Sequence, residues 1–157
     1  MLLKGLIEED FLQYKEPSMF LIFPSCTMKC DRECGRPICQ NSDLANAPLI
    51  GIEVEKLVQR YLDNPITKAI VCGGLEPMDS FEQLVELVRV LRRFSADFVV
   101  VYTGYRNDEI EDELEELSKF PNIIVKFGRY VPDQEPHFDE VLGVNLASSN
   151  QYAARIS

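Results

Sequence analysis

Short apolar runs alternate with amphipathic helical patterns along most of this chain. Four runs have the composition of strands: Met19–Phe23, Lys68–Cys72, Phe98–Tyr102 and Ile123–Phe127. Helical spacing of apolar residues occurs over 52–63, 80–93 and 108–119. Strands that alternate with helices of about 10–15 residues predict βαβ units with right-handed crossovers. Because the apolar residues in these runs are continuous and do not alternate with polar ones, they predict an α/β fold whose mostly parallel sheet is covered on both faces.

Two of the helical segments have a distinct buried stripe. In 52–63 the stripe contains Val54, Leu57, Val58, Tyr61 and Leu62, and in 80–93 it contains Phe81, Leu84, Val85, Val88 and Leu91. Such stripes predict helices that pack on the sheet. Asp79, followed by Glu82 three residues later, predicts a capping box at the start of the second helix.

Size and charge narrow the class of protein. At 157 residues the chain is expected to be a single domain, 1–157, that buries a core without needing a metal. Its formal net charge of −10 opposes direct binding to nucleic acid. No apolar run approaches the roughly 20 residues of a membrane helix, and the charges within 1–14 leave no apolar core for a leader peptide. We expect a cytoplasmic protein whose acidic run, 107–119, is the solvated face of a helix.

Four of the five cysteines lie in one polar loop of fourteen residues after the first strand: Cys26, Cys30, Cys34 and Cys39. Such a cluster in a cytosolic chain is typical of a metal or redox site. Two pairs, Cys26 with Cys30 and Cys34 with Cys39, would suit a structural zinc ion. The spacing matches neither common ferredoxin pattern, but a cluster on three thiolates, with one iron open to a small molecule, also fits. Cys72 lies within a strand and is expected to be core packing.

Glycine-rich or polar segments follow each of the other three strands. They are Gly73-Gly74-Leu75-Glu76-Pro77, Thr103-Gly104-Tyr105 and Gly128-Arg129-Tyr130. Either glycine segment alone predicts only a turn. Because the carboxyl ends of parallel strands meet at one edge of a sheet, these segments and the cysteine loop together predict one site.

These residues resemble the radical S-adenosylmethionine (SAM) enzymes, and most closely the small activases of anaerobic (class III) ribonucleotide reductase. The resemblance extends over roughly 18–152. It rests on Cys26-x3-Cys30 with a further cysteine, Gly-Gly-x-Glu-Pro, Tyr102-Thr-Gly-Tyr105, Gly128-Arg-Tyr-Val131 and Ser148-Ser-Asn-Gln151. A chain this short lacks room for eight barrel strands. The resemblance therefore implies a partial, open (β/α) barrel of the radical SAM type, with a macromolecular substrate closing its mouth.

The resemblance also implies a cofactor set and a reaction. A [4Fe-4S] cluster would be held by three cysteines, and SAM would chelate the fourth iron. One electron, from a donor such as flavodoxin or ferredoxin, would cleave SAM to a 5′-deoxyadenosyl radical. That radical would take hydrogen from a glycine in the large subunit of the reductase. No side chain beyond the cofactor is expected to be catalytic, and the one histidine, His137, is expected to be a bystander.

Carried onto this sequence, the resemblance implies Cys26, Cys30 and Cys39 as the cluster ligands. The family spacing is Cys-x3-Cys-x2-Cys, so Cys34 is the alternative third ligand, and we prefer Cys39 because Gln40-Asn41 follows it. Asn41 would support the cluster loop. Contacts to SAM are implied for Gly73, Gly74, Glu76, Thr103, Gly104 and Tyr105. Leu75 interrupts the usual Gly-Gly-Glu-Pro, which puts the direction of Glu76 in doubt.

Two other functions stay open on the sequence. Radical SAM chemistry could act on another glycyl-radical enzyme or on a small molecule. A non-catalytic Zn(Cys)4 interaction module would also account for the cysteine pairs.

Overall fold

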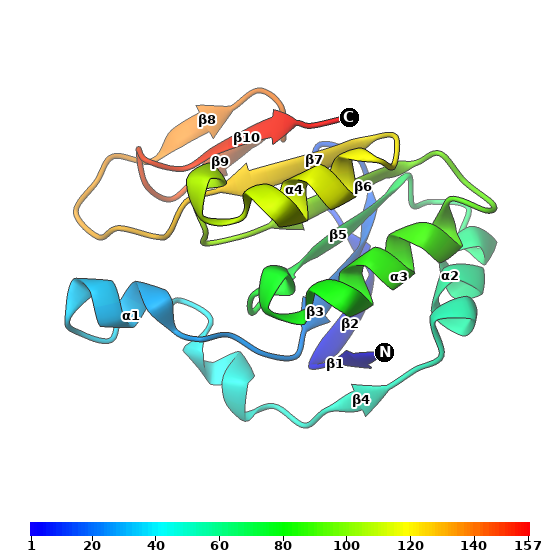
Figure 1. Cartoon of the computed structure of the whole chain (residues 1–157), viewed down its shortest axis with the longest axis horizontal. Helices are drawn as coiled ribbons and strands as arrows, with labels where there is room; N and C mark the ends of the chain where they lie inside the picture. Colours follow the sequence, from blue (N-terminus) through cyan, green and yellow to red (C-terminus); the bar gives the residue numbers. More distant parts are fainter.

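The computed structural model describes residues 1–157 and has a six-stranded sheet at its centre (Figure 1). The strand order is β10-β7-β6-β5-β3-β2. The four inner strands are the predicted ones, and they pair in parallel: β3 (Ser18–Phe23), β5 (Ala69–Gly74), β6 (Phe98–Tyr102) and β7 (Ile123–Phe127). The outer strands β2 (Gly5–Asp10) and β10 (Tyr152–Arg155) are antiparallel to their neighbours. The prediction of an α/β fold with a mostly parallel sheet is confirmed, and the sheet does not close into a barrel.

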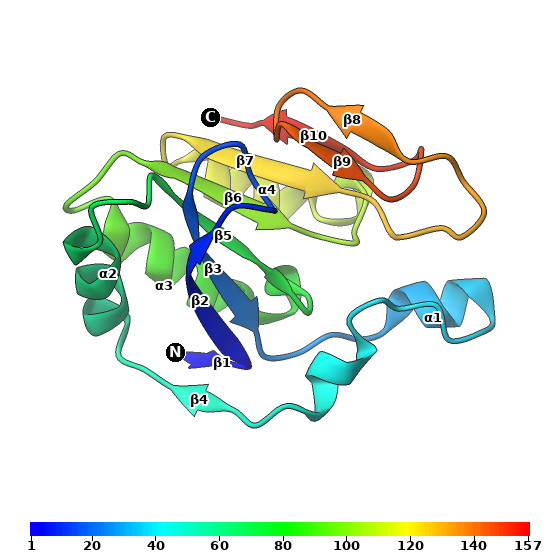
Figure 2. The same ribbon diagram turned by 180° about the vertical axis from the view of Figure 1, so that it is seen from behind.

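The three long helices cover one face of the sheet, as Figures 1 and 2 show from opposite sides. They are α2 (Val54–Asp63), α3 (Phe81–Leu91) and α4 (Glu111–Ser118). Their buried leucines and valines form the larger core with the strand residues that point to the same face. Cys72 is fully buried in this core, as predicted for a packing residue. No helix in the protein is both long enough and apolar enough to cross a membrane.

The opposite face is covered by loops and a small ribbon instead of helices (Figure 2). Tyr14, from the β2–β3 connection, packs there with Leu142 and Leu146 against the second core. The ribbon consists of β8 (His137–Asp139) and β9 (Val144–Leu146). Asp139 also accepts a hydrogen bond from the Ala153 N–H of β10 at 2.9 Å, which satisfies a donor near the sheet edge.

Three sequence expectations are wrong in detail. Helix α3 begins at Phe81 with Ser80 at its N-cap and no side-chain cap, so the capping box of Asp79 and Glu82 is absent. Asp79 lies in the 3-10 helix η2 (Pro77–Ser80) and bonds to the site described below. Leu62 is 36% exposed and does not join the buried stripe of α2. The helix expected over 108–119 is divided into the 3-10 helix η3 (Asn107–Glu109) and α4.

The glycine pair at the end of β5 has a packing role. A Cβ on Gly73 would lie 3.0 Å from the Phe20 ring. Gly74 has a φ of +82°, and a Cβ there would lie 2.5 Å from Cγ2 of Ile22 in β3. Both glycines therefore allow close approach of neighbouring strands and side chains. A substitution at either position would disturb this packing, whether or not a ligand binds nearby.

We predict that Gly74→Ala destabilises the protein by about 3 kcal/mol, from a left-handed φ and an overpacked contact with Ile22. Gly35→Ala is the matched control, because Gly35 also has a positive φ, +72°, but a Cβ on it would meet no atom within 4 Å. It should cost only about 1 kcal/mol. Urea unfolding of the full chain measures both, and equal losses would contradict the contact with Ile22.

Candidate metal centre

The carboxyl ends of β3, β5, β6 and β7 meet at one edge of the sheet, as predicted. Parallel register places Phe23 beside Gly74 and Tyr102 beside Lys126. Main-chain hydrogen bonds continue past the strand ends, since Glu76 N–H donates to the Ser25 carbonyl at 2.9 Å. The cysteine loop, the glycine-rich loop after β5 and the turn after β6 thus lie against one another.

The cysteine loop is built around a short helix, α1 (Lys29–Cys34). Cys26 comes before the helix, Cys30 lies in its first turn, and Cys34 is its exposed last residue. Asp31 folds the rest of the loop back, because its Oδ1 accepts the N–H groups of Ile38 and Cys39, both at 2.8 Å. Cys39 is thereby returned toward the helix that carries Cys30.

Three of the loop thiols, those of Cys26, Cys30 and Cys39, are half-buried. Electrostatic interaction links two pairs of them, Cys26 with Cys30 and Cys30 with Cys39. Burial raises the pKa of Cys26 to about 11, with further contributions from Glu76, Asp79 and Cys30. Burial also raises the pKa of Cys30, to which Cys39 adds while Arg129 opposes. Cys26 and Cys39 therefore both lie near Cys30. Cys34 is exposed and contributes to neither shift.

This donor set suits an iron–sulfur cluster. Half-buried thiols with raised pKa values are poor thiolates alone, whereas coordination to a metal deprotonates them. Gly104 leaves room beside them, since a Cβ there would lie 3.7 Å from the Cys30 Sγ. No three His, Cys, Asp or Glu side chains are arranged to hold one metal ion. A zinc ion needs its thiolates to converge at about 2.3 Å, while each thiolate of a cluster binds a separate iron.

Comparison with known families agrees with the donor set. The family model of the 4Fe-4S single cluster domain matches residues 18–152, which is most of the chain. The chain belongs to this 4Fe-4S family. The domain is found in radical SAM-type activating proteins. No curated protein matches the sequence. The zinc alternative has no such match, and the protein is an iron–sulfur protein with one cluster domain.

Glu76 ties two loops of the 4Fe-4S domain together. Its side chain is only 6% exposed, and its oxygens accept Gly104 N–H at 2.8 Å and Met78 N–H at 3.1 Å. Burial raises its pKa to about 7, while these hydrogen bonds oppose the rise. With Leu75 buried just before it, Glu76 points across to the turn after β6. Its carboxylate is thus engaged within the protein.

The turn after β6 also uses its side chains internally. Thr103 is 2% exposed, and its hydroxyl accepts the Tyr105 N–H at 3.0 Å. The Tyr105 hydroxyl donates to Asp79 at 2.7 Å, and Asp79 accepts the Thr27 N–H at 2.8 Å through its other oxygen. Gly104 is the member of this turn that lies next to a thiol, because a Cβ on it would lie 3.7 Å from the Cys30 Sγ. Asn41 is exposed and precedes the 3-10 helix η1 (Ser42–Asn46).

Sequence reasoning missed Lys126 and Glu109 at this edge, and it placed Arg129 here without its partner. Lys126, inside β7, is 7% exposed and donates to the Gly128 carbonyl at 2.8 Å. Arg129 is 6% exposed and forms a two-pronged ion pair with Glu109, both bonds at 2.8 Å. A lysine within an otherwise apolar strand was a usable signal for the first. Glu109 belongs to the acidic run 107–119, from which we predicted only a solvated helix face, so the sequence did not distinguish it from its neighbours.

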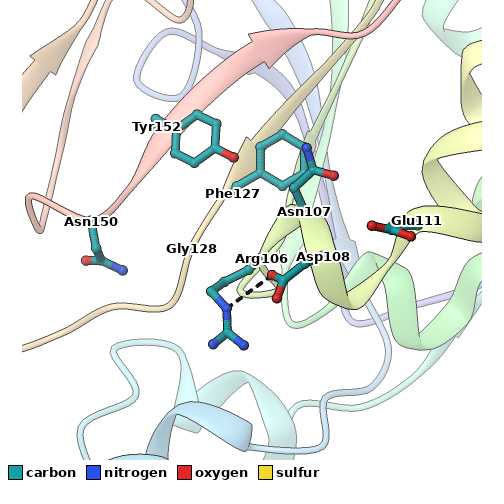
Figure 3. Close-up of a pocket in the computed structure, with 8 residues that line it drawn as sticks. All are labelled: Arg106, Asn107, Asp108, Glu111, Phe127, Gly128, Asn150 and Tyr152. Atoms are coloured by element: carbon teal, nitrogen blue, oxygen red, sulfur yellow. Dashed lines mark hydrogen bonds and ion pairs between the residues drawn. The ribbon is translucent and has the colours of Figure 1, made fainter.

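A separate cavity of about 470 Å³ opens beside the start of α4 (Figure 3). Its walls include Phe127 and Tyr152, whose rings stack with centroids 5.2 Å apart. Arg106 and Asp108 form an exposed ion pair at its rim, with a nitrogen–oxygen distance of 3.3 Å. No cysteine lines this cavity, so it is not part of the metal centre.

We predict that Cys26→Ala, Cys30→Ala and Cys39→Ala each prevent cluster assembly, because each removes a thiol from the half-buried group. Cys34→Ala is the matched control, and it should keep full iron and the brown colour. Iron content after anaerobic reconstitution measures all four, with about four irons per chain expected for wild type. Loss of iron in Cys34→Ala with retention in Cys39→Ala would reverse the choice of third ligand.

Lys126 should make stability depend on alkaline pH. Burial lowers its pKa to about 8 from 10.5, so between these values the unfolded chain holds a proton that the folded chain lacks. Stability contributed by this group therefore rises with pH across the window. Relative to Lys126→Met, wild type should gain about 3 kcal/mol, since each pH unit is worth about 1.4 kcal/mol. Urea unfolding at several pH values measures this, and exposed Lys119→Met should show no such trend.

Proposed function

We propose that this protein is a radical SAM activase that installs a glycyl radical on an anaerobic ribonucleotide reductase. The bound cluster would supply the difficult step, passing one electron from a flavodoxin- or ferredoxin-class donor to SAM and breaking a sulfonium C–S bond to give methionine and a 5′-deoxyadenosyl radical. Transfer of a hydrogen atom from a glycine Cα of the reductase would then give 5′-deoxyadenosine and a stored radical.

One observation carries this proposal. The thiols of Cys26, Cys30 and Cys39 are half-buried, and Cys30 interacts electrostatically with each of the other two, while Cys34 stays exposed at the end of α1. Three thiolate ligands leave one iron of a four-iron cluster without a protein ligand, and that iron is where a small chelating molecule such as SAM would bind. An electron-transfer protein with a fully ligated cluster would need a fourth ligand.

The chain's own groups at this edge suit a positioning role. Gly104 brings side-chain-free main chain next to Cys30, and Glu76 fixes that main chain through the Gly104 N–H. Lys126 and Arg129 are buried cations near Cys30, where they favour negatively charged thiolates and carboxylates. His137 lies in β8, away from the loop. The edge therefore combines cations and backbone with the carboxylates of Glu76, Asp79 and Glu109, which are hydrogen-bonded within the protein.

A protein substrate agrees with the open architecture. The loops and ribbon leave part of the helix-free face uncovered, where Phe20, Ile22 and Tyr102 are partly exposed and Ile7 on the neighbouring strand is 43% exposed. A closed barrel would cover such a face, whereas here a partner has to exclude water from the radical. The large subunit of the reductase is the proposed partner. Another glycyl-radical enzyme or a small molecule remains the alternative target.

We predict that the anaerobically reconstituted protein, given dithionite and SAM, releases 5′-deoxyadenosine and methionine in equal amounts. Gly104→Leu should keep the cluster but lower this release about 100-fold, because the side chain fills the space where SAM has to be aligned. Gly104→Ala is the graded control, since its Cβ makes only ordinary contacts of 3.5–3.7 Å and Gly104 has no left-handed φ.

Chromatography of the products measures the reaction, and iron content and the visible spectrum show whether the cluster is intact. Absence of SAM cleavage in wild type with four irons would remove the radical SAM proposal. Full cleavage in Gly104→Leu would show that SAM does not bind at this turn. Adding the reductase large subunit and recording a glycyl radical by electron paramagnetic resonance tests the target separately.

A further inference from the structure

The helix that carries Cys30 has no residue in the core. None of the six residues of α1 is buried, so core packing does not hold the helix in place. Its N-terminal approach is fixed by the Thr27–Asp79 hydrogen bond at 2.8 Å. The charged side chains of α1 restrain the position of Cys30 further.

Two of those side chains, Lys29 and Glu33, are linked to the carboxylate of Glu109, the first directly and the second through Arg129. Lys29 Nζ lies 2.7 Å from Glu109 Oε1. Glu109 also accepts both terminal nitrogens of Arg129, each at 2.8 Å. Arg129 Nε in turn lies 3.2 Å from Glu33 Oε2, on the last turn of α1. Lys29, Glu109, Arg129 and Glu33 thus form a continuous ion-pair network, which begins and ends on α1 and joins this helix to η3 and to the exit of β7.

The centre of this network, Glu109 with Arg129, is largely shielded from solvent, so its ion pairs can restrain the position of α1. The side chain of Glu109 is 15% exposed and that of Arg129 is 7% exposed. The Arg129 hydrogen bonds hold the pKa of Glu109 well below its usual range, although partial burial opposes this. Lys29 and Arg129 share the Tyr105 ring, at 5.0 and 5.8 Å from its centroid. Without Glu109, Lys29 would lose its ion-pair partner and Arg129 would keep only Glu33, although both cations lie near the same ring.

The network also reaches the metal centre. A Cβ on Gly104 would lie 3.7 Å both from Arg129 Cγ and from Cys30 Sγ, so the stem of Arg129 and this thiol border the same small space. Arg129 also lowers the pKa of Cys30. The position of Arg129, fixed by its fork on Glu109, therefore determines the electrostatic surroundings of a cluster ligand.

We propose that Glu109 is a positioning residue for the cluster. It pairs with Lys29 and Arg129, and through them it fixes the position of α1, which carries Cys30, and the charge beside that thiol. This inference rests on the cluster of the 4Fe-4S domain and not on SAM chemistry. Groups that orient metal ligands in this way typically contribute 10- to 100-fold to metal affinity.

The acidic run supplies a matched control. Glu111 is two residues further along, is exposed, and takes part in no ion pair. Glu109→Gln and Glu111→Gln therefore remove the same charge from nearly the same part of the chain. Only the first removes the anion that Lys29 and Arg129 share.

The experiment uses the full chain carrying its reconstituted cluster, under anaerobic conditions. Iron release to the ferrous chelator bathophenanthroline should be about tenfold faster in Glu109→Gln than in wild type, and unchanged in Glu111→Gln. The midpoint potential, from loss of visible absorbance during reduction, should move to more positive values, because a negative charge near the cluster is removed. Lys29→Met, which removes one arm of the network from a partly exposed side chain, should give a smaller acceleration.

The inference is overturned if iron release from Glu109→Gln stays within twofold of wild type, or if Glu111→Gln matches it. Faster release with an unchanged potential would also overturn it, in favour of a general loosening of the loop. Should Glu109→Gln fail to fold, an unchanged release rate in Lys29→Met overturns the inference and a faster one supports it. SAM is absent from these measurements, so a protein that fails to cleave SAM leaves their outcome intact.

Discussion

The parallel register of β3, β5, β6 and β7 is the constraint on which the metal centre depends. Strands in parallel all end at the same edge, so each βα connection delivers its loop to one place. The glycines at the end of β5 make this approach close, because a side chain at Gly74 would collide with Ile22 of β3. The site is thus assembled by the sheet, and the loops need only short hydrogen bonds to complete it.

Much of this arrangement could be predicted from the sequence, and the misses have physical reasons. Continuous apolar runs such as Phe98–Tyr102 identify buried parallel strands without ambiguity. The edge strand β2 was not predicted, because its sequence contains Glu8, Glu9 and Asp10 and lacks the apolar run of an inner strand. Asp79 was misassigned because a carboxylate three residues before a glutamate has the local pattern of a helix cap, whereas its actual partners, Thr27 and Tyr105, are distant in sequence.

The same distinction applies to the site residues. The cysteines could be predicted as a group, because thiols at this density in a polar loop have few other uses. That Cys39 returns toward Cys30 depends on Asp31, whose carboxylate bonds two N–H groups of the loop, and no spacing rule contains that contact. The buried ion pair of Arg129 with Glu109 joins residues from two different strand exits, so it appears only once the fold brings those exits together.

Charge placement connects these features to the role of the cluster. The chain carries a formal net charge of −10, yet two of its cations, Lys126 and Arg129, are buried at the edge where the thiols gather. Burying a cation is unfavourable unless an anion lies nearby. Arg129 has Glu109, but the Lys126 ammonium donates its hydrogen bond to the neutral Gly128 carbonyl, and burial lowers its pKa although Glu76 opposes the shift. Thiolates assembled around a cluster would supply negative charge beside Lys126. Binding of the cluster should therefore stabilise the fold as well as give it chemistry.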